Sequence, residues 1–235
     1  MRRYLIVDDN REFAENLAEI IRDLGAEVAI AEGGAEALAL AAAHRYDALL
    51  TDMRMPFMGG AELVHHLRHI DPGMPAMVVT AHAGDNDLEA ARREGLLAVL
   101  PKPVPLERLL ELFGQARRNG LVAVIEDDPH QSDNLTELLR TRGFAAVTAA
   151  SVLETERLGP VRPFAALCDL RVPGGPDGEA MRRLAAKFPG LPMLVVSGVA
   201  AEPPLPCAGR FEKPFDTAAL LAALERLHAE AVPSP

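Results

Sequence analysis

The most constraining feature of this 235-residue chain is that four short segments occur twice, in the same order. The first set reads LIVDDN, DALLTDMRMP, MPAMVVTAH and LPKPV, and the second reads AVIEDD, AALCDLRVP, LPMLVVSGV and FEKPF. The two copies keep a nearly constant offset, with Asp169 lying 117 residues after Asp52. Ordered repetition over this length indicates a tandem duplication of one domain of ordinary size. We therefore expect two domains, residues 1–118 and residues 119–235.

Composition narrows the class of protein. Hydrophobic residues make up 49% and charged residues 25%, which is typical of soluble globular proteins. The net charge of -10 argues against nucleic acid or an anionic membrane as a partner, because both are negative themselves. No apolar run reaches the ~18 residues of a membrane span, and the first residues do not resemble a signal peptide. Two cysteines are too few for a disulfide framework, so we expect a reduced, cytoplasmic protein without membrane insertion.

Short apolar runs alternate with amphipathic stretches in both halves. In the first amphipathic stretch, one helical face is marked by large apolar side chains: Phe13, Leu17, Ile20, Ile21 and Leu24. Strands that are apolar throughout, each followed by a helix, predict a parallel sheet covered on both faces. We expect an α/β fold with five such strand–helix pairs in each domain.

The second half departs from the first in one place. Six fewer residues separate Ser197 from Lys213 than separate Thr80 from Lys102. The shortened segment holds three prolines, which oppose a regular helix. The fourth helix of the second domain is therefore predicted to be lost or shortened.

Polar residues follow the predicted strands at the point where each strand ends. The first set is Asp8, Asp9, Asp52, Thr80 and Lys102, and the second is Glu126, Asp127, Asp169, Ser197 and Lys213. Open α/β sheets bind ligands at the carboxyl ends of their strands, so each set is expected to converge there. Three clustered carboxylates favour a hard divalent cation such as Mg²⁺ (or Mn²⁺). A lysine and a hydroxyl beside a metal-bound carboxylate are the groups that phosphoryl transfer uses.

With these motifs, each half resembles the receiver domain of two-component response regulators, and the two together cover essentially the whole chain. The resemblance implies two flavodoxin-like (CheY-like), doubly wound, five-stranded parallel sheets with strand order 2-1-3-4-5. It also implies a function in signal transduction: acceptance of a phosphoryl group on aspartate from a phosphohistidine partner, which switches a protein-interaction face. Beyond this self-catalysed transfer and hydrolysis of the acyl phosphate, we do not expect an enzyme.

The resemblance assigns roles residue by residue. The phospho-acceptors would be Asp52 and Asp169. The metal would be held in one half by Asp8, Asp9, Asp52 and the backbone carbonyl of Arg54, and in the other by Glu126, Asp127, Asp169 and the backbone carbonyl of Arg171. The phosphoryl group would be contacted at Thr80, Ala81 and Lys102, or at Ser197, Gly198 and Lys213. Two positions depart from the family pattern, because Val99 and Arg210 stand where the family often has an aromatic switch residue.

Partners and alternatives complete the prediction. The expected partners are a histidine kinase or histidine phosphotransfer protein and a downstream protein, and a homodimer is left open. In one alternative, the first domain alone is phosphorylated and the second is a docking or dimerisation adaptor. In another, the fold binds a small ligand such as a flavin, which the acidic strand ends disfavour. The histidines at positions 65, 66 and 69 are expected on a solvated helix face rather than at a metal, and His82 follows Thr80 closely enough to lie near the site.

Overall fold

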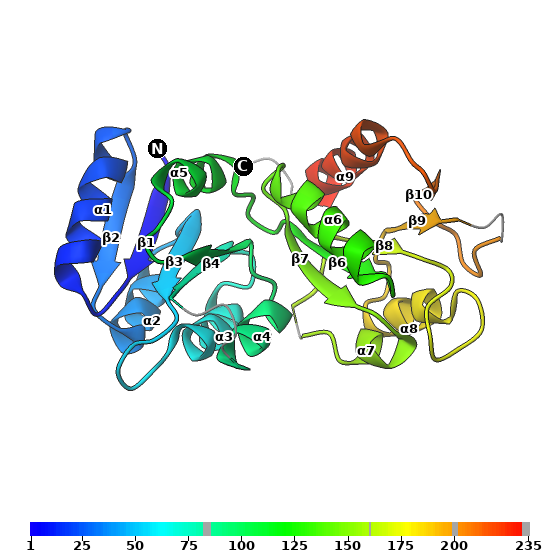
Figure 1. The fold of residues 1–235 in the computed structure, drawn as a ribbon, viewed down its shortest axis with the longest axis horizontal. Coiled ribbons are helices and arrows are strands. Elements are labelled where there is room, and N and C mark those ends of the chain that lie inside the picture. Colours follow the sequence, from blue (N-terminus) through cyan, green and yellow to red (C-terminus); the bar gives the residue numbers. More distant parts are fainter. Residues whose placement is uncertain (82–85, 160, 199–201, 232–235) are drawn as a thin grey trace. The chain divides into compact units, whose positions relative to one another are not determined.

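The computed structural model describes residues 1–81, 86–159, 161–198 and 202–231. The chain divides into two compact units, Met1–Arg118 (unit 1) and Asn119–Pro235 (unit 2), and each is described by itself. Figure 1 shows that both are α/β units in which helices flank a central sheet. Within the described ranges, no helix is both long enough and apolar enough to cross a membrane.

Unit 1 contains a five-stranded parallel sheet of order β2-β1-β3-β4-β5. Its strands are β1 (Arg3–Val7), β2 (Glu27–Ala31), β3 (Ala48–Asp52), β4 (Ala76–Thr80) and β5 (Ala98–Pro101). Its helices are α1 (Arg11–Asp23), α2 (Gly34–Ala43), α3 (Gly60–Ile70), α4 (Asn86–Arg93) and α5 (Leu106–Gln115). Every residue of β3 and β4 is buried, as expected for central strands covered on both faces. The predicted fold and strand order are confirmed in this unit.

The apolar face of α1 differs from the sequence prediction. Leu17 and Ile21 are buried together with two alanines, whereas Ile20 is 40% and Leu24 66% exposed. The predicted face was placed by the large apolar side chains and therefore included Ile20. In the structure, small alanines form part of the buried face instead. Leu24 lies beyond the last helical residue, as the C-cap, and is therefore not held against the core.

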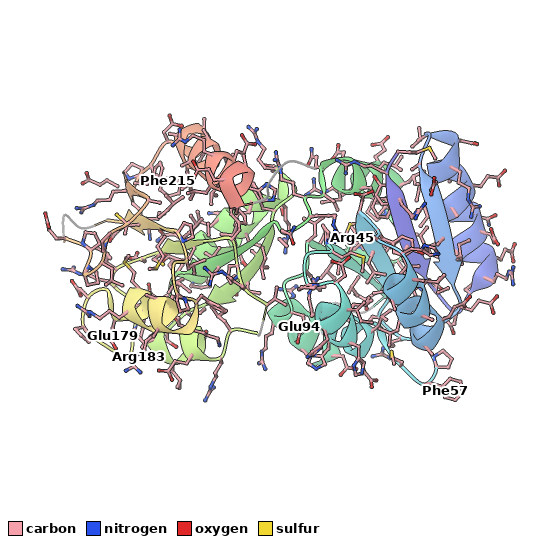
Figure 2. All side chains as sticks on the ribbon, turned by 180° about the vertical axis from the view of Figure 1, so that it is seen from behind. Arg45, Phe57, Glu94, Glu179, Arg183 and Phe215 are labelled. Atoms are coloured by element: carbon pink, nitrogen blue, oxygen red, sulfur yellow. The ribbon has the colours of Figure 1, made fainter. Side chains whose placement is uncertain are left out.

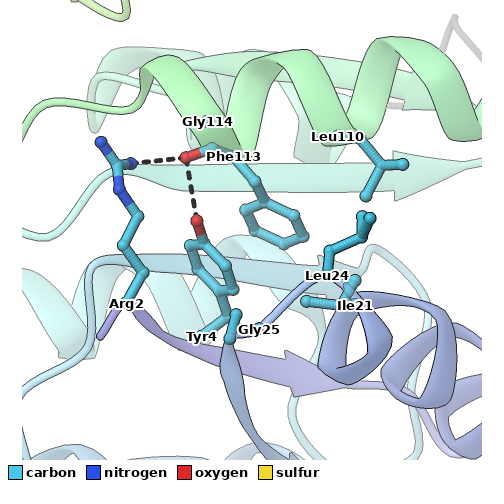
Figure 3. Close-up of a pocket in the computed structure, with 9 residues that line it drawn as sticks. Arg2, Tyr4, Ile21, Leu24, Gly25, Leu110, Phe113 and Gly114 are labelled. Carbon is cyan, nitrogen blue, oxygen red and sulfur yellow. Dashed lines mark hydrogen bonds between the residues drawn. The ribbon is translucent and has the colours of Figure 1, made fainter.

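The amino-terminal end of unit 1 is fastened to α5 through Tyr4. The rings of Tyr4 and Phe113 stack with centroids 4.2 Å apart, and the Tyr4 hydroxyl donates a 3.1 Å hydrogen bond to the Phe113 carbonyl. Arg2 donates to the same carbonyl at 2.6 Å. Figure 3 shows these groups beside a small pocket that is also lined by Ile21 and Leu110. These contacts fix the position of α5 against the start of β1.

Unit 2 contains a second parallel sheet, of order β10-β9-β8-β6-β7. Its strands are β6 (Leu121–Ile125), β7 (Ala145–Ala149), β8 (Ala165–Cys168), β9 (Met193–Ser197) and β10 (Gly209–Glu212). Its helices are α6 (Pro129–Arg140), α7 (Val152–Glu156), α8 (Glu179–Lys187) and α9 (Thr217–Ala231). Counted from the first strand of the unit, the order is again 2-1-3-4-5, as the sequence predicted.

The segment between β9 and β10 contains no helix in its described part, residue 198 and residues 202–208. This finding agrees with the predicted loss of the fourth helix. The segment packs on the loop that follows β8, because a Cβ added at Gly178 would overlap the ring of Pro204. A proline-rich strap thus occupies the stretch in which unit 1 has α4.

Candidate functional site

The strand register of unit 1 brings the predicted side chains to one edge of the sheet. Asp52 is the last residue of β3 and pairs with Val79, so the adjacent Thr80 closes β4 beside it. Asp8 follows β1, which neighbours β3, and the backbone N–H of Lys102 donates to the Thr80 carbonyl at 3.0 Å. The carboxyl ends of four neighbouring strands therefore supply one site, as the sequence predicted.

The turn between β1 and α1 positions the neighbouring carboxylates of Asp8 and Asp9. Asn10 begins α1 as its N-cap, with its side chain accepting from the backbone N–H of Phe13 at 3.0 Å. The backbone N–H of Asn10 in turn donates to Asp8 Oδ1 at 2.9 Å. This turn buries Asp8 and leaves Asp9 exposed at the mouth of the site.

Three carboxylates meet at this turn. Oxygen atoms of Asp8, Asp9 and Asp52 all lie within 4.8 Å of one another, and no other such group of three His, Cys, Asp or Glu side chains occurs in the part of the chain that the structure describes. Carboxylate oxygens are the donors that Mg²⁺ prefers, and three negative charges at this separation favour a divalent cation between them. The donor set therefore fits the metal that the sequence predicted.

Lys102 neutralises part of this charge. Its Nζ lies 2.9 Å from Asp52 Oδ2 and 3.3 Å from Asp8 Oδ2. Burial alone would lower the pKa of Lys102, but the hydrogen bond to Asp52 and the charges of both carboxylates outweigh burial and raise it. Burial also raises the pKa of Asp8, against the opposing effects of the Asn10 N–H and Lys102. The lysine is therefore a permanent cation directly beside the candidate acceptor.

Two further residues shape the site, although neither was identified as functional from the sequence. Gly60, the first residue of α3, donates its N–H to the Met53 carbonyl at 2.9 Å and lies so close to Asp52 that a Cβ would overlap the Asp52 carbonyl oxygen. The ring of Phe13 lies beneath the ammonium of Lys102, 5.5 Å from its centroid, at the distance of a cation–π contact. In the sequence, only the Gly-Gly pair at the start of α3 points to the close approach of Gly60 to Asp52. Phe13 was interpreted as one more residue of the apolar face of the first helix.

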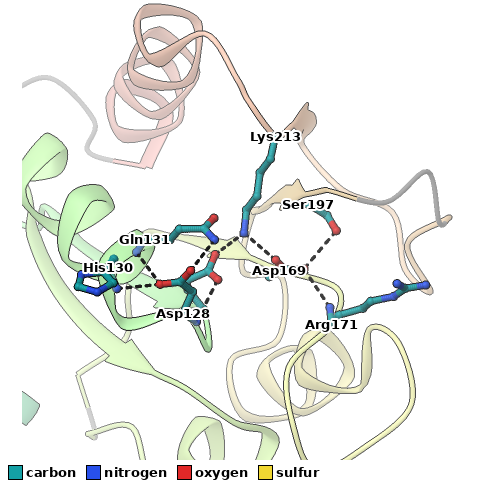
Figure 4. A network of polar contacts seen from close by, with 8 residues as sticks. Asp128, His130, Gln131, Asp169, Arg171, Ser197 and Lys213 are labelled. Carbon is teal, nitrogen blue, oxygen red and sulfur yellow. Dashed lines mark hydrogen bonds and ion pairs between the residues drawn. The ribbon is translucent and has the colours of Figure 1, made fainter.

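Unit 2 builds a similar network at the same edge of its sheet (Figure 4). Lys213 Nζ lies 2.5 Å from Glu126 Oε2 and 2.7 Å from Asp169 Oδ2. Ser197 Oγ donates to Asp169 Oδ1 at 3.1 Å, and the backbone N–H of Arg171 donates to the same oxygen at 3.0 Å. Both lysines precede a cis proline. The second predicted set therefore also converges, with one exception.

The exception is Asp127, which is exposed and does not join its two neighbours in a group of three within the described residues. Glu126 is one methylene longer than Asp8, which has the same position in unit 1. Its carboxylate lies 2.5 Å from Lys213 Nζ, whereas that of Asp8 lies 3.3 Å from Lys102 Nζ. Burial raises the pKa of Glu126, while Lys213 acts in the opposite direction. In unit 2 the lysine thus contacts two carboxylates at 2.5 and 2.7 Å, closer than the 3.3 and 2.9 Å of Lys102 in unit 1.

The remaining predicted positions lie as follows. Ala81 and Gly198 are exposed at the ends of β4 and β9, and Arg54 is exposed on the loop after β3. Along β10, Arg210 is exposed, whereas the adjacent Phe211 packs against the hydrophobic core, because successive side chains of a strand point to opposite faces.

The surroundings of one cysteine and of three histidines bear on their chemistry. Cys168 is buried in β8, and burial raises its thiol pKa to about 12, which suits packing rather than reactivity. His65, His66 and His69 are exposed on α3, as predicted, with His65 Nδ1 lying 2.9 Å from Glu94. His82 lies outside the described residues.

Acidic residues, a lysine and a hydroxyl residue at the carboxyl edge of a 2-1-3-4-5 sheet define the class of receiver domains. Residues 4–113 match the family model of the response regulator receiver domain. A response regulator receiver protein of Anaeromyxobacter sp. (strain Fw109-5) is 73% identical over 230 residues, which cover 98% of this chain and 97% of that protein. The chain therefore belongs to the response regulator receiver family. The family match covers most of unit 1 and ends before unit 2 begins.

Other relatives match less of the chain. The response regulator MprA of Mycobacterium ulcerans (strain Agy99) is 31% identical over 172 residues, 72% of each chain. The transcriptional regulatory protein GlrR of Escherichia coli (strain K12) is 32% identical over 122 residues, 52% of this chain and 28% of that protein. Among solved structures, the chemotaxis protein CheY4 of Vibrio cholerae is 30% identical and covers 48% of this chain and 97% of that chain, with a TM-score of 0.46.

Proposed function

We propose that the chain accepts a phosphoryl group on Asp52 from a phosphohistidine of a partner protein, either a histidine kinase or a histidine phosphotransfer protein. Family membership supports the reaction class. The observation that carries the assignment to Asp52 is its position: it closes the central strand β3, shares a cluster with Asp8 and Asp9, and touches Lys102. Mg²⁺, or Mn²⁺, would be held by these three carboxylates and the Arg54 backbone carbonyl.

In the transfer, a carboxylate oxygen of Asp52 attacks phosphorus in line with the bond to the donor histidine. The P–N bond breaks, and its electron pair leaves with the ring nitrogen, which takes a proton from solvent. When bound, the cation neutralises oxygens of the phosphoryl group as negative charge is redistributed. Lys102 is already placed to pair with the transferred group, and Thr80 and Ala81 close the neighbouring strand at which its oxygens would lie.

Hydrolysis restores the unphosphorylated chain. Water attacks phosphorus, the bond between phosphorus and the Asp52 oxygen breaks, and inorganic phosphate leaves while the carboxylate re-forms. In between, the phosphoryl group gives Lys102 and Thr80 a new partner and biases a conformational equilibrium of the surrounding loops. A downstream protein that binds one conformation better than the other would read this state.

The same proposal extends to Asp169, with Glu126, Asp127 and the Arg171 carbonyl toward a cation and with Ser197, Gly198 and Lys213 toward the phosphoryl group. A second candidate is that unit 1 alone is phosphorylated and unit 2 is a docking or dimerisation adaptor. Among the described residues, unit 2 has no group of three clustered carboxylates, which favours the second candidate, while the matching aspartate, hydroxyl and lysine favour the first.

One experiment tests both. The full chain, Asp52→Asn and Asp169→Asn are incubated with phosphoramidate and Mg²⁺, and intact mass reports the phosphoryl groups added. Two groups on the wild type and one on each variant would support acceptance in both units. One group that is lost only in Asp52→Asn would support the adaptor. Phosphorylation that persists in Asp52→Asn and is lost in Asp169→Asn, or no phosphorylation of any chain, would refute the assignment to Asp52.

A further inference from the structure

The loop between β3 and α3 carries an aromatic side chain that the phosphotransfer chemistry does not use. Phe57 is fully exposed, and Figure 2 shows it at the tip of this loop, pointing away from the body of unit 1. Its backbone has φ +67°, in the left-handed region that bulky residues rarely adopt. A side chain that packs on nothing, held in a disfavoured backbone conformation, contributes nothing visible to the fold. Such positions are typical of functional sites.

The duplication supplies an internal comparison. Counted from the acceptor aspartate, the position of Phe57 in unit 1 corresponds to Gly174 in unit 2, which also has a positive φ, +102°. Glycine is the residue that this backbone shape favours, since it lacks a Cβ. Unit 1 therefore has phenylalanine at a place where the loop alone would select glycine.

A second aromatic residue near the acceptor of unit 1 is also replaced in unit 2. Phe13, counted from the first acid of the turn, corresponds to Gln131 in unit 2, which bonds to Asp128. In unit 1 the Phe13 ring is half-buried and lies under Lys102, which in turn contacts Asp52. Unit 1 thus has an aromatic residue in the first turn of α1 and another on the loop after β3, and both are replaced in unit 2.

The distance between Phe57 and the acceptor Asp52 indicates which partner could cover the Phe57 ring. The loop starts at Asp52 and returns to it at Gly60, so three residues of chain place Phe57 within about 11 Å of Gly60. A protein that docks over Asp52 with a standard interface buries about 800 Å² of this surface, a disc of roughly 16 Å radius. A protein that brings a phosphohistidine to Asp52 can therefore reach Phe57 as well.

From these observations we infer that Phe57 anchors the phosphodonor protein, which carries an apolar pocket beside its phosphohistidine. Exposed aromatic side chains that become buried in partner pockets are typical interface hot spots. The inference rests on the proposed function, because it assumes that a phosphohistidine protein approaches Asp52. It also implies that unit 2, with Gly174 and Gln131, lacks this anchor and is not recognised in the same way.

The test compares two donors. Phosphoramidate needs no docking surface and reports acceptance by Asp52 alone. The protein donors are the histidine kinase transmitter domains and phosphotransfer proteins encoded in the same genome, each labelled from ATP and profiled on the full chain. The fastest of them is then used on the wild type, Phe57→Gly, Phe57→Tyr and the control Leu24→Ala, which removes another exposed apolar side chain of unit 1.

For Phe57→Gly we expect KM for the protein donor to rise tenfold or more, with little change in the maximal rate, and the ratio of protein-donor to phosphoramidate rates to fall by the same factor. Phe57→Tyr keeps the ring and should restore most of the ratio, and Leu24→Ala should leave it unchanged. The melting temperature of Phe57→Gly should not fall, because glycine relieves the positive φ.

Three results would overturn the inference. An unchanged ratio in Phe57→Gly would show that the ring is not an anchor. A wild type that is labelled by phosphoramidate but by no protein donor would remove the partner while leaving Asp52 as the acceptor. Self-association of the phosphorylated wild type that Phe57→Gly abolishes in sedimentation, with KM unchanged, would assign the ring to a second copy of the chain. Absence of labelling by phosphoramidate would instead refute the proposed function.

Discussion

Gly60 lies directly against the backbone of the candidate acceptor, and replacing it with alanine tests how tightly the site depends on this contact. An added Cβ would overlap the Asp52 carbonyl oxygen and lie 3.1 Å from Met53 Cα and 3.2 Å from the Asp52 carbonyl carbon. These are backbone atoms at the end of a buried strand, so no side-chain rotation can relieve the overlap. The strand end or the start of α3 must therefore move by roughly half an ångström or more.

The size of the effect follows from this geometry. Forcing one extra carbon into a packed region costs about 1–3 kcal/mol, and alanine regains a part of this as the better helix former. A net loss of about 2 kcal/mol lowers the melting temperature of a unit of this size by about 6–10 °C. The displaced acceptor should also be phosphorylated about tenfold more slowly by phosphoramidate, because in-line attack tolerates little misplacement.

The assay is calorimetry of the full chain together with the initial rate of phosphorylation. Gly114→Ala is the matched control, since a Cβ there meets nothing within 4 Å and lies in α5. It should raise the melting temperature of unit 1 by about 2 °C, which also identifies the transition of that unit. If Gly60→Ala melts at the wild-type temperature and accepts phosphate at the wild-type rate, the close contact with Asp52 has no role in building the site.

Three further predictions concern unit 1. Asp8→Asn should abolish the rise in melting temperature that Mg²⁺ gives the wild type, measured by thermal unfolding with and without the cation, because it removes one of the three clustered carboxylates. Arg68→Met should cost about 3 kcal/mol in urea unfolding, because this buried guanidinium donates to four backbone carbonyls that would lose their donor. Burial raises the pKa of Tyr4 above 10.0, so the stability it contributes is complete below that pH and is lost as pH rises through the raised pKa. Tyr4→Phe should therefore flatten the alkaline limb of the unfolding profile while losing about 1 kcal/mol from the bond to Phe113.

The convergence of the site could be predicted because it depends on topology alone. Asp8, Asp52 and Lys102 lie far apart in the sequence, but each follows an apolar strand, and parallel strands bring their carboxyl ends to one edge. The repeat added a second, independent occurrence of the same pattern. No side-chain geometry was needed for this step, which is why the three residues meet in unit 1 as predicted, whereas the contacts of Lys102 with Asp8 and Asp52 come from the structure alone.

Other features could not be predicted because they depend on packing between elements. The face of α1 was placed by its large apolar residues, whereas the actual contact uses alanines and leaves Ile20 exposed. Phe13 is on the edge of that face, and only the structure shows it under Lys102. Similarly, glutamate at position 126 reads as an ordinary exchange for aspartate, yet its extra methylene decides how closely it reaches Lys213.

The two units differ most at positions whose residue type the fold does not determine. Positions at strand ends, which the sheet itself brings together, keep two acidic residues, a hydroxyl residue and a lysine in both units. Positions around the strand ends diverge: unit 2 has Gly174 for Phe57, Gln131 for the helical Phe13, and a proline-rich strap in the stretch that forms α4 in unit 1. Residues around the site are constrained by the molecules that bind over it, whereas strand-end residues are constrained by the chemistry within it. The strand-end positions therefore agree between the units more closely than the positions around them, and phosphorylation of Asp52→Asn and Asp169→Asn tests whether this shared pattern gives both units the same chemistry.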